Sequence, residues 1–88
     1  MVKIEDDIIV KNIHGLHARP AAIFVQIASK FDAKVLLSKD NEIVDGKSII
    51  AILSLGINSG TKIRLIVDGE DAEKAFYELK NFLERNDD

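Results

Sequence analysis

Two kinds of hydrophobic spacing alternate along this chain of 88 residues, and their order restricts its fold more than any other feature. Four short stretches are strand-like, the first and the last with apolar residues at every second position. Three other stretches place apolar residues three and four positions apart, as amphipathic helices do. The order of these stretches is βαββαβα. We therefore expect a two-layer α+β sandwich, in which the helices cover one face of a four-stranded sheet.

Turn and cap residues mark where these elements begin and end. Asp40-Asn41 tolerate left-handed backbone angles and can close a hairpin. Ser48 is a good helix N-cap, and Gly56 is a typical helix stop. The last helix has the clearest spacing, with apolar residues at Ala72, Ala75, Phe76, Leu79, Phe82 and Leu83. We expect strands around Ile8 and Val10 and at 35–38, 42–44 and 63–67, and helices from 18 to about 31, at 49–55 and at 72–83.

Composition and charge exclude several classes of protein. The chain has no cysteine, so it forms neither a disulfide framework nor a thiolate metal site, which fits a reducing cytoplasm. Its longest apolar stretch, 49–57, is far shorter than the roughly 20 residues that cross a bilayer, and no signal peptide is recognisable. The net charge is −3, and the 12 Lys and Arg residues are spread along the chain. We therefore expect a cytoplasmic single domain that neither binds nucleic acid nor inserts into a membrane.

The segment 15–21, Gly-Leu-His-Ala-Arg-Pro-Ala, places a histidine where the first helix is expected to begin. The partial positive charge of a helix N-terminus disfavours an imidazolium ion and attracts any anion that the ring comes to hold. Arg19 adds a cation that can bind phosphate oxygens in bidentate fashion. Pro20 suits a first helical turn, in which the amides of Ala18 and Arg19 stay free near the ring. These residues predict an anion site.

The same segment resembles the active-site signature of HPr, the histidine-containing phosphocarrier protein of the bacterial phosphoenolpyruvate-dependent sugar phosphotransferase system. Residues 24–35 are similar to the rest of that family's first helix and its following strand, and residues 46–56 resemble a second signature around a regulatory serine. The resemblance implies one phosphocarrier domain over residues 1–88. It also implies an antiparallel open-faced sheet, in which the first strand pairs with the fourth and the second lies between the fourth and the third.

For function, the resemblance implies a phosphorylated carrier that is not itself an enzyme and uses no cofactor. Nδ1 of His17 would accept a phosphoryl group from phospho-enzyme I and pass it to sugar-specific IIA domains of permeases. Arg19 and the backbone amide of Ala18 would hold the phosphoryl oxygens. Since a shuttle has to leave each partner quickly, we expect a monomer with small docking contacts.

The second helix adds regulation and docking to this interpretation. Ser48 matches the serine that a bifunctional HPr kinase/phosphorylase modifies, and the phosphoserine form of such proteins binds a catabolite-control transcription regulator. Many relatives have methionines at positions 50 and 53, and the stiffer isoleucine and leucine here would accommodate fewer partners. The family's apolar docking patch beside the histidine is matched here by Ala18, Ala22, Ile49, Ile50 and Leu53.

Other functions stay open. A regulatory binding protein could act through phospho-Ser48 alone, although catabolite-repression relatives of HPr lack the histidine that is present here as His17. A nitrogen-related phosphotransfer chain is disfavoured by the Ser48 signature, and a general α+β ligand-binding module would not be phosphorylated. His14 is expected to face solvent. Because His14 and His17 have no carboxylate or cysteine partner nearby, we expect no metal site.

Overall fold

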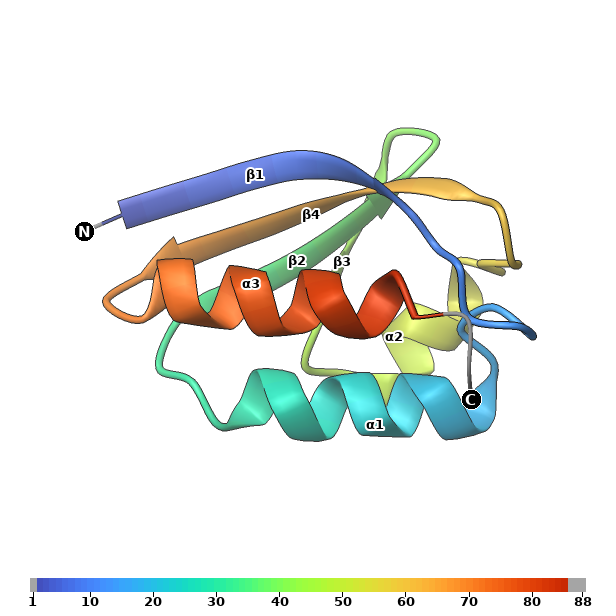
Figure 1. Ribbon diagram of the computed structural model, residues 1–88, viewed down its shortest axis with the longest axis horizontal. Helices are drawn as coiled ribbons and strands as arrows, with labels where there is room; N and C mark the ends of the chain where they lie inside the picture. The colour runs from blue at the N-terminus through green and yellow to red at the C-terminus, as the bar shows by residue number, and fades with distance from the viewer. Residues whose placement is uncertain (1, 86–88) are drawn as a thin grey trace.

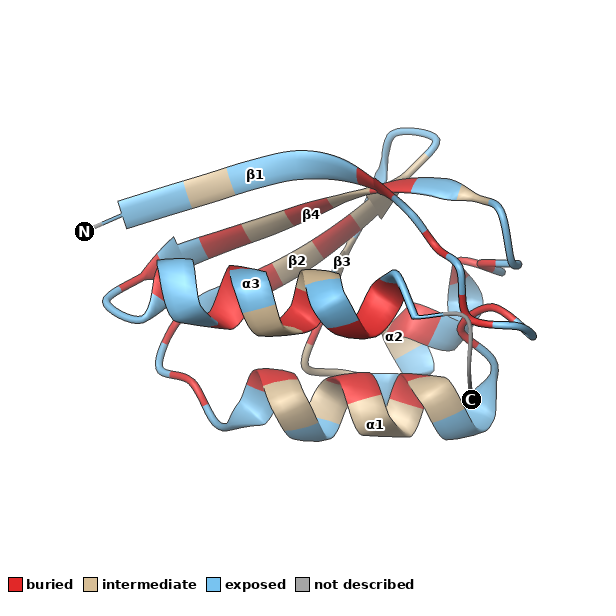
Figure 2. Ribbon diagram, viewed as in Figure 1, coloured by how far each residue is buried: buried red, intermediate tan, exposed pale blue. Residues whose placement is uncertain are grey.

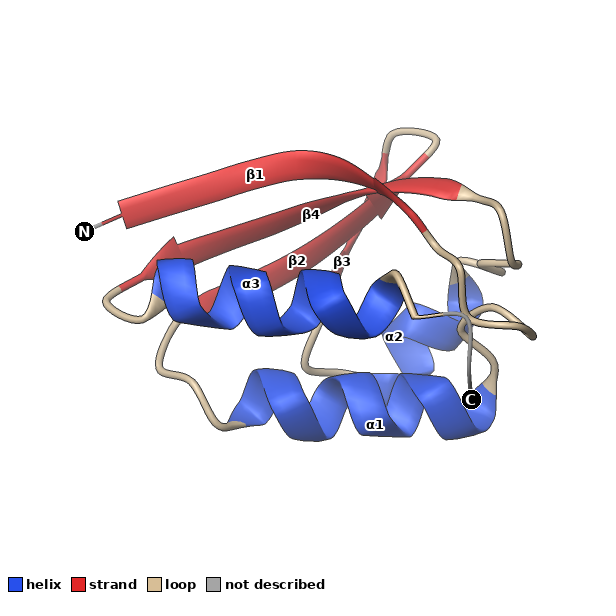
Figure 3. Ribbon diagram, in the orientation of Figure 1, coloured by secondary structure: helices blue, strands red, loops and turns tan. Residues whose placement is uncertain are grey.

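The computed structural model describes residues 2–85, so both ends of the expected 1–88 domain lie outside the described residues. The order βαββαβα is confirmed (Figure 1 and Figure 3). In chain order, the elements are β1 (Val2–Ile9), α1 (Ala18–Ser29), β2 (Lys34–Lys39), β3 (Glu42–Asp45), α2 (Ile49–Ser54), β4 (Lys62–Gly69) and α3 (Ala72–Leu83).

The four strands form one antiparallel sheet in the order β1-β4-β2-β3, as the family resemblance implies. β1 pairs with β4 along its whole length, from Val2 opposite Gly69 to Ile9 opposite Lys62. The turn between β2 and β3 passes through Asp40 and Asn41, whose φ angles are 51° and 70°. Two consecutive left-handed residues are what a tight hairpin needs, so this prediction is also confirmed.

The helices lie on one side of the sheet, and the core fills the space between the two layers (Figure 2). α3 packs on β1 and β4, while α1 packs against α2 and α3. Alternate residues of β2 and β4 point into the core. The apolar residues predicted for the last helix are all buried, namely Ala72, Ala75, Phe76, Leu79, Phe82 and Leu83. Within residues 2–85, none of the helices has the length and apolar character needed to cross a membrane.

Several boundaries differ from the prediction by one or two residues, and the start of β1 differs by more. β1 begins at Val2, well before Ile8. Val2 and Ile4 are in phase with Ile8 and Val10, but Asp6 interrupts the alternation, and backbone pairing with β4 continues across the interruption. α1 ends at Ser29 instead of near Phe31. The N–H groups of Lys30 and Phe31 donate to carbonyls three residues back, which tightens and ends the helix, although Phe31 stays in the core.

The outer face of the sheet carries ion pairs along β1 and β4. Arg64 donates to Oδ1 of Asp7 at 2.9 Å and to Oε1 of Glu5 at 3.1 Å. The hydrogen bond from this guanidinium holds the pKa of Glu5 below its usual value of 4.5. Exposed pairs of this kind add little to stability. They do make this part of the open face polar, on the side of the sheet away from the helices.

Gly15 connects β1 to α1 through a close backbone contact. Its φ of +68° is left-handed, and a Cβ at this position would overlap the backbone of Ile57 and Asn58. Leu16 adds a hydrogen bond from its N–H to the Ile57 carbonyl at 2.9 Å. The Gly15 N–H donates to the carbonyl of Asn12 at 3.0 Å and closes a turn. The segment just before α1 is therefore held against the segment that leads into β4.

Replacing Gly15 by alanine should destabilise the protein strongly. The left-handed backbone costs a residue with a Cβ about 1–2 kcal/mol, and overlap with the 57–58 backbone adds to this, for a total of about 3 kcal/mol or more. Gly56→Ala is the matched control, because Gly56 has a φ of +63° but nothing within 4 Å of the added Cβ. Urea unfolding should show a much larger loss for Gly15→Ala, and equal losses would contradict the close contact.

Candidate functional site

His17 is the N-cap residue of α1, and its side chain does not cap the helix. The residue has extended backbone angles, φ −79° and ψ −172°, and α1 begins at Ala18 as the sequence predicts. The His17 carbonyl accepts the first hydrogen bond of the helix, from the N–H of Ala21 at 2.8 Å. The ring makes no capping hydrogen bond, and the residue is exposed. An imidazole in this position is open to a reactant from solvent.

The first turn of α1 leaves two N–H donors next to this ring. The amides of Ala18 and Arg19 precede the first residue that can bond within the helix, and Pro20 has no N–H. Unpaired amides together with the helix dipole make this terminus attractive to an anion. Arg19 is also exposed, and within residues 2–85 it makes no ion pair. The partial positive charge of the helix N-terminus and the full charge of Arg19 therefore meet at one helix end.

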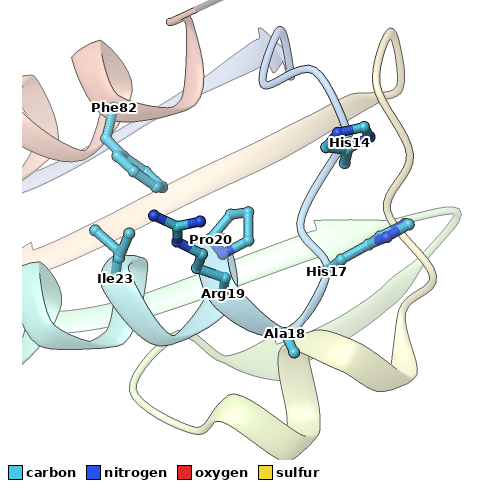
Figure 4. Close-up of a pocket in the computed structure, with 7 residues that line it drawn as sticks. All are labelled: His14, His17, Ala18, Arg19, Pro20, Ile23 and Phe82. Carbon is cyan, nitrogen blue, oxygen red and sulfur yellow. The ribbon is translucent and has the colours of Figure 1, made fainter. Parts of the chain in front are cut away.

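A pocket of about 330 Å³ lies between the start of α1 and the end of α3. Figure 4 shows the His17 and His14 side chains on one side of this pocket and the Arg19 guanidinium on the other, toward Phe82. Pro20 lies between the two sides (Figure 4). The lining consists of His14, His17, Ala18, Arg19, Pro20, Ile23 and Phe82. The structure thus places His17, Ala18 and Arg19 around one cavity.

Three of the lining residues had no role in the site predicted from sequence. Phe82 was expected as core, and it is only 4% exposed, yet its ring also forms a wall of the pocket. Ile23 had no assigned role. His14 is exposed as expected, but it shares the pocket with His17. A hydrogen bond of 3.1 Å from Nδ2 of buried Asn12 to the Phe82 carbonyl joins the two distant segments, and no local sequence pattern reveals it.

Ser48 has the structural role that the sequence predicts. It is the N-cap of α2, and its Oγ accepts a hydrogen bond from the N–H of Ala51 at 3.2 Å. The residue is half-buried. The other end of α2 is closed by Lys39, whose Nζ donates to the carbonyls of Leu55 and Gly56 at 3.0 Å each. Side-chain hydrogen bonds therefore cap both ends of this short helix.

An apolar surface is left exposed on α2. Ile50 is 82% exposed, and Ile49 and Leu53 are each 40% exposed, while Ile52 points inward and is fully buried. α2 packs beside α1, where Ala18 is exposed. Figure 4 shows the Ala18 side chain directed toward α2. We call the set predicted from sequence the α1/α2 patch; its members are Ala18, Ala22, Ile49, Ile50 and Leu53.

The described residues contain no group of three His, Cys, Asp or Glu side chains placed to hold a metal ion. What the site offers is a nucleophilic ring, two amides and a guanidinium. Together these groups are suited to bind and hold a phosphoryl group.

Comparison with known proteins identifies the family. A family model described as the PTS HPr component phosphorylation site matches residues 4–85. The HPr-like protein Crh of Halalkalibacterium halodurans is 43% identical over 82 residues, which cover 93% of this chain and 98% of that protein. The phosphocarrier protein HPr of Xylella fastidiosa is 41% identical over 81 residues, covering 92% and 91%.

A solved structure agrees with these sequence matches. The crystal structure of a phosphocarrier protein HPr from Bacillus anthracis superposes with a TM-score of 0.91 at 38% identity, covering 94% of this chain and 99% of that one. The chain therefore belongs to the HPr family of the phosphotransferase system, which includes phosphocarriers as well as HPr-like Crh proteins and whose members are not enzymes.

Proposed function

We propose that the chain, as one domain over residues 1–88, carries phosphoryl groups in sugar uptake. Phospho-enzyme I donates a phosphoryl group to His17, and phospho-His17 passes it to IIA domains of sugar permeases. The observation that supports this most directly is the exposed N-cap ring of His17, which makes no capping bond and lies beside the free amides of Ala18 and Arg19. The carrier works in the cytoplasm as a monomer.

In the proposed transfer, neutral His17 attacks through Nδ1. The nitrogen–phosphorus bond of the donor breaks as the bond to Nδ1 forms. The His17 ring gives up its Nε2 proton and the donor ring takes up one proton, so that both rings end neutral and no other reactant is consumed. The amides of Ala18 and Arg19 stabilise the negative charge that spreads over the three phosphoryl oxygens. Arg19 is long and exposed, so its guanidinium can turn from the Phe82 side of the pocket toward the phosphoryl group.

Incubation with enzyme I and phosphoenolpyruvate tests this proposal. We expect one acid-labile, base-stable phosphoryl group, which is absent from His17→Ala. Arg19→Ala should keep the fold and slow the transfer at least about tenfold, equivalent to about 1.4 kcal/mol of transition-state stabilisation. Mass spectrometry and rapid-quench kinetics are the measurements. If competent enzyme I leaves the wild-type protein unphosphorylated, the carrier function is wrong.

The α1/α2 patch is the docking surface of this proposal for enzyme I and for the acceptors. Exposed aliphatic side chains beside the reactive ring can be buried when a partner approaches it, and Ile50 is the most exposed of them at 82%. The contact would be small, because rapid release requires a modest interface.

Ile50→Asp should weaken docking without unfolding the protein. We expect KM for transfer from enzyme I to rise about tenfold, because the substitution places an unpaired charge in a desolvated apolar contact. Ile43→Asp is the matched control, since Ile43 is 59% exposed but lies on β3, on the outer face of the sheet. Equal effects of the two substitutions would show that docking does not use α2.

Ser48 adds regulation to the proposal. A serine kinase/phosphorylase would place a phosphate on the N-cap of α2, where the helix N-terminus tolerates negative charge. The same charge, at the edge of the α1/α2 patch, would repel an acidic docking partner. Phosphorylated Ser48 would also form the binding surface for a catabolite-control transcription regulator.

Incubation with ATP and the cognate kinase should produce one phosphoserine, lost in Ser48→Ala. Ser54→Ala is the matched control, because Ser54 is an exposed serine of the same helix, with its Oγ bonded to the Ala51 carbonyl. Ser48→Ala itself should cost about 1 kcal/mol of stability through loss of the N-cap. The phosphorylated protein should accept phosphoryl groups from enzyme I more slowly. Absence of phosphoserine would remove this regulatory role.

A regulatory binding protein is the second candidate, supported by the 43% identity to a protein named HPr-like protein Crh. In that case Ser48 alone would be phosphorylated, and His17 would remain unmodified with competent enzyme I. The two phosphorylation assays therefore separate the candidates, and both modifications can occur on one carrier.

A further inference from the structure

His14 lines the pocket between the start of α1 and the end of α3, and the proposed function gives its imidazole no role. It lines the same cavity as His17 and Arg19, and Figure 4 shows it on the His17 side of that cavity. The residue is exposed, so it exchanges protons freely with water. An imidazole ordinarily titrates near pH 6.5, which makes it the side chain best able to change charge near neutral pH.

The backbone holds His14 at this place. The turn that carries it is closed by the hydrogen bond from the Gly15 N–H to the Asn12 carbonyl at 3.0 Å. On one side, buried Asn12 is bonded to the Phe82 carbonyl of α3. On the other, Leu16 is buried and its N–H is bonded to Ile57. His14 is therefore presented to the pocket by a turn anchored at both ends.

Within residues 2–85, the charged or titratable groups that line the pocket with His14 are His17 and Arg19, both from the start of α1. The end of α3 contributes the uncharged Phe82, and the guanidinium of Arg85 lies 6.0 Å from the centre of that ring. The segment 57–61, on which Gly15 and Leu16 pack, contains no titratable side chain. A phosphoryl group on His17 brings negative charge into the same cavity, and this charge favours the protonated form of His14.

We propose that His14 binds a proton when His17 is phosphorylated and, as an imidazolium ion, pairs with the phosphoryl group, so that phosphoryl transfer is coupled to proton uptake. This inference rests on the proposed carrier function. The phosphoryl transfer keeps the balance described above, one nitrogen–phosphorus bond broken and one formed. The added proton comes from water and is returned when the phosphoryl group leaves.

Linkage makes the coupling reciprocal. If the phosphoryl group increases the affinity of His14 for a proton by some factor, protonation of His14 favours phospho-His17 by the same factor. The titration midpoint of His14 should rise by about half a pH unit to one unit, a three- to tenfold gain in proton affinity, which is less than for a buried pair because both rings are exposed. Higher salt should reduce the shift.

Nuclear magnetic resonance of the ring protons during pH titration measures this midpoint directly. The protein is titrated before and after phosphorylation by enzyme I, and phosphorus resonances report whether His17 carries the phosphoryl group. We expect the His14 midpoint to rise only in the phosphorylated form. In addition, His14→Gln should flatten the pH dependence of the phosphoryl equilibrium with enzyme I. Ile13→Gln is the matched control, an exposed position of the same turn outside the pocket lining, and should keep that dependence.

The outcomes separate the two proposals. A His14 midpoint that stays unchanged while phosphorus resonances show phospho-His17 overturns the coupling and leaves the carrier function intact. An unaltered pH dependence in His14→Gln also overturns it. If His17 takes no phosphoryl group from competent enzyme I, the carrier function fails and the coupling fails with it.

Discussion

The close contact of Gly15 with the backbone of residues 57–58 is the constraint on which the site depends. Only a residue without Cβ can take the left-handed angle and approach this closely. This contact fixes the end of the connection from β1 to α1, so that Leu16 reaches the core while His17 stays outside. Any rearrangement here would move the N-terminus of α1 and, with it, both free amides.

A second feature of the fold is that two helices, α1 and α2, contribute residues to the candidate site. α1 supplies the reactive ring, the amides and the guanidinium, whereas α2 supplies the exposed apolar surface and Ser48. The packing of α1 on α2 brings these parts to one end of the molecule. Charge near Ser48 can therefore affect what approaches His17 with no change of fold. The outer face of the sheet, with Arg64 and its carboxylates, lies on the side away from the helices.

Much of the fold could be predicted because its core follows local periodicity. The spacing in α3, the left-handed pair Asp40 and Asn41, and the N-cap Ser48 are each encoded within a few residues, and the structure confirms each one. The first half of β1 was missed, because Asp6 interrupts the alternation that Val2 and Ile4 share with Ile8, and the backbone pairing with β4 that continues the strand is not visible in the sequence. The end of α1 was also missed, because Phe31 is buried beyond the helix and continues the apolar spacing.

For the site, the residues around His17 were enough to predict that the N-terminus of α1 binds an anion. The N-cap His17, the two free amides and the Arg19 guanidinium are all neighbours in the chain. The strand order could be predicted only through the family resemblance. The residues that line the pocket could be identified only from the tertiary structure. Its walls combine His14, before α1, with Phe82, near the C-terminal end of the described chain. The Asn12 bond to Phe82 and the Gly15 contact bring these distant segments together. The local sequence therefore determined the reacting groups, namely the ring, the amides and the guanidinium. Only the tertiary structure decided which other residues surround them, because contacts between residues so far apart in the chain leave no periodic pattern in the sequence.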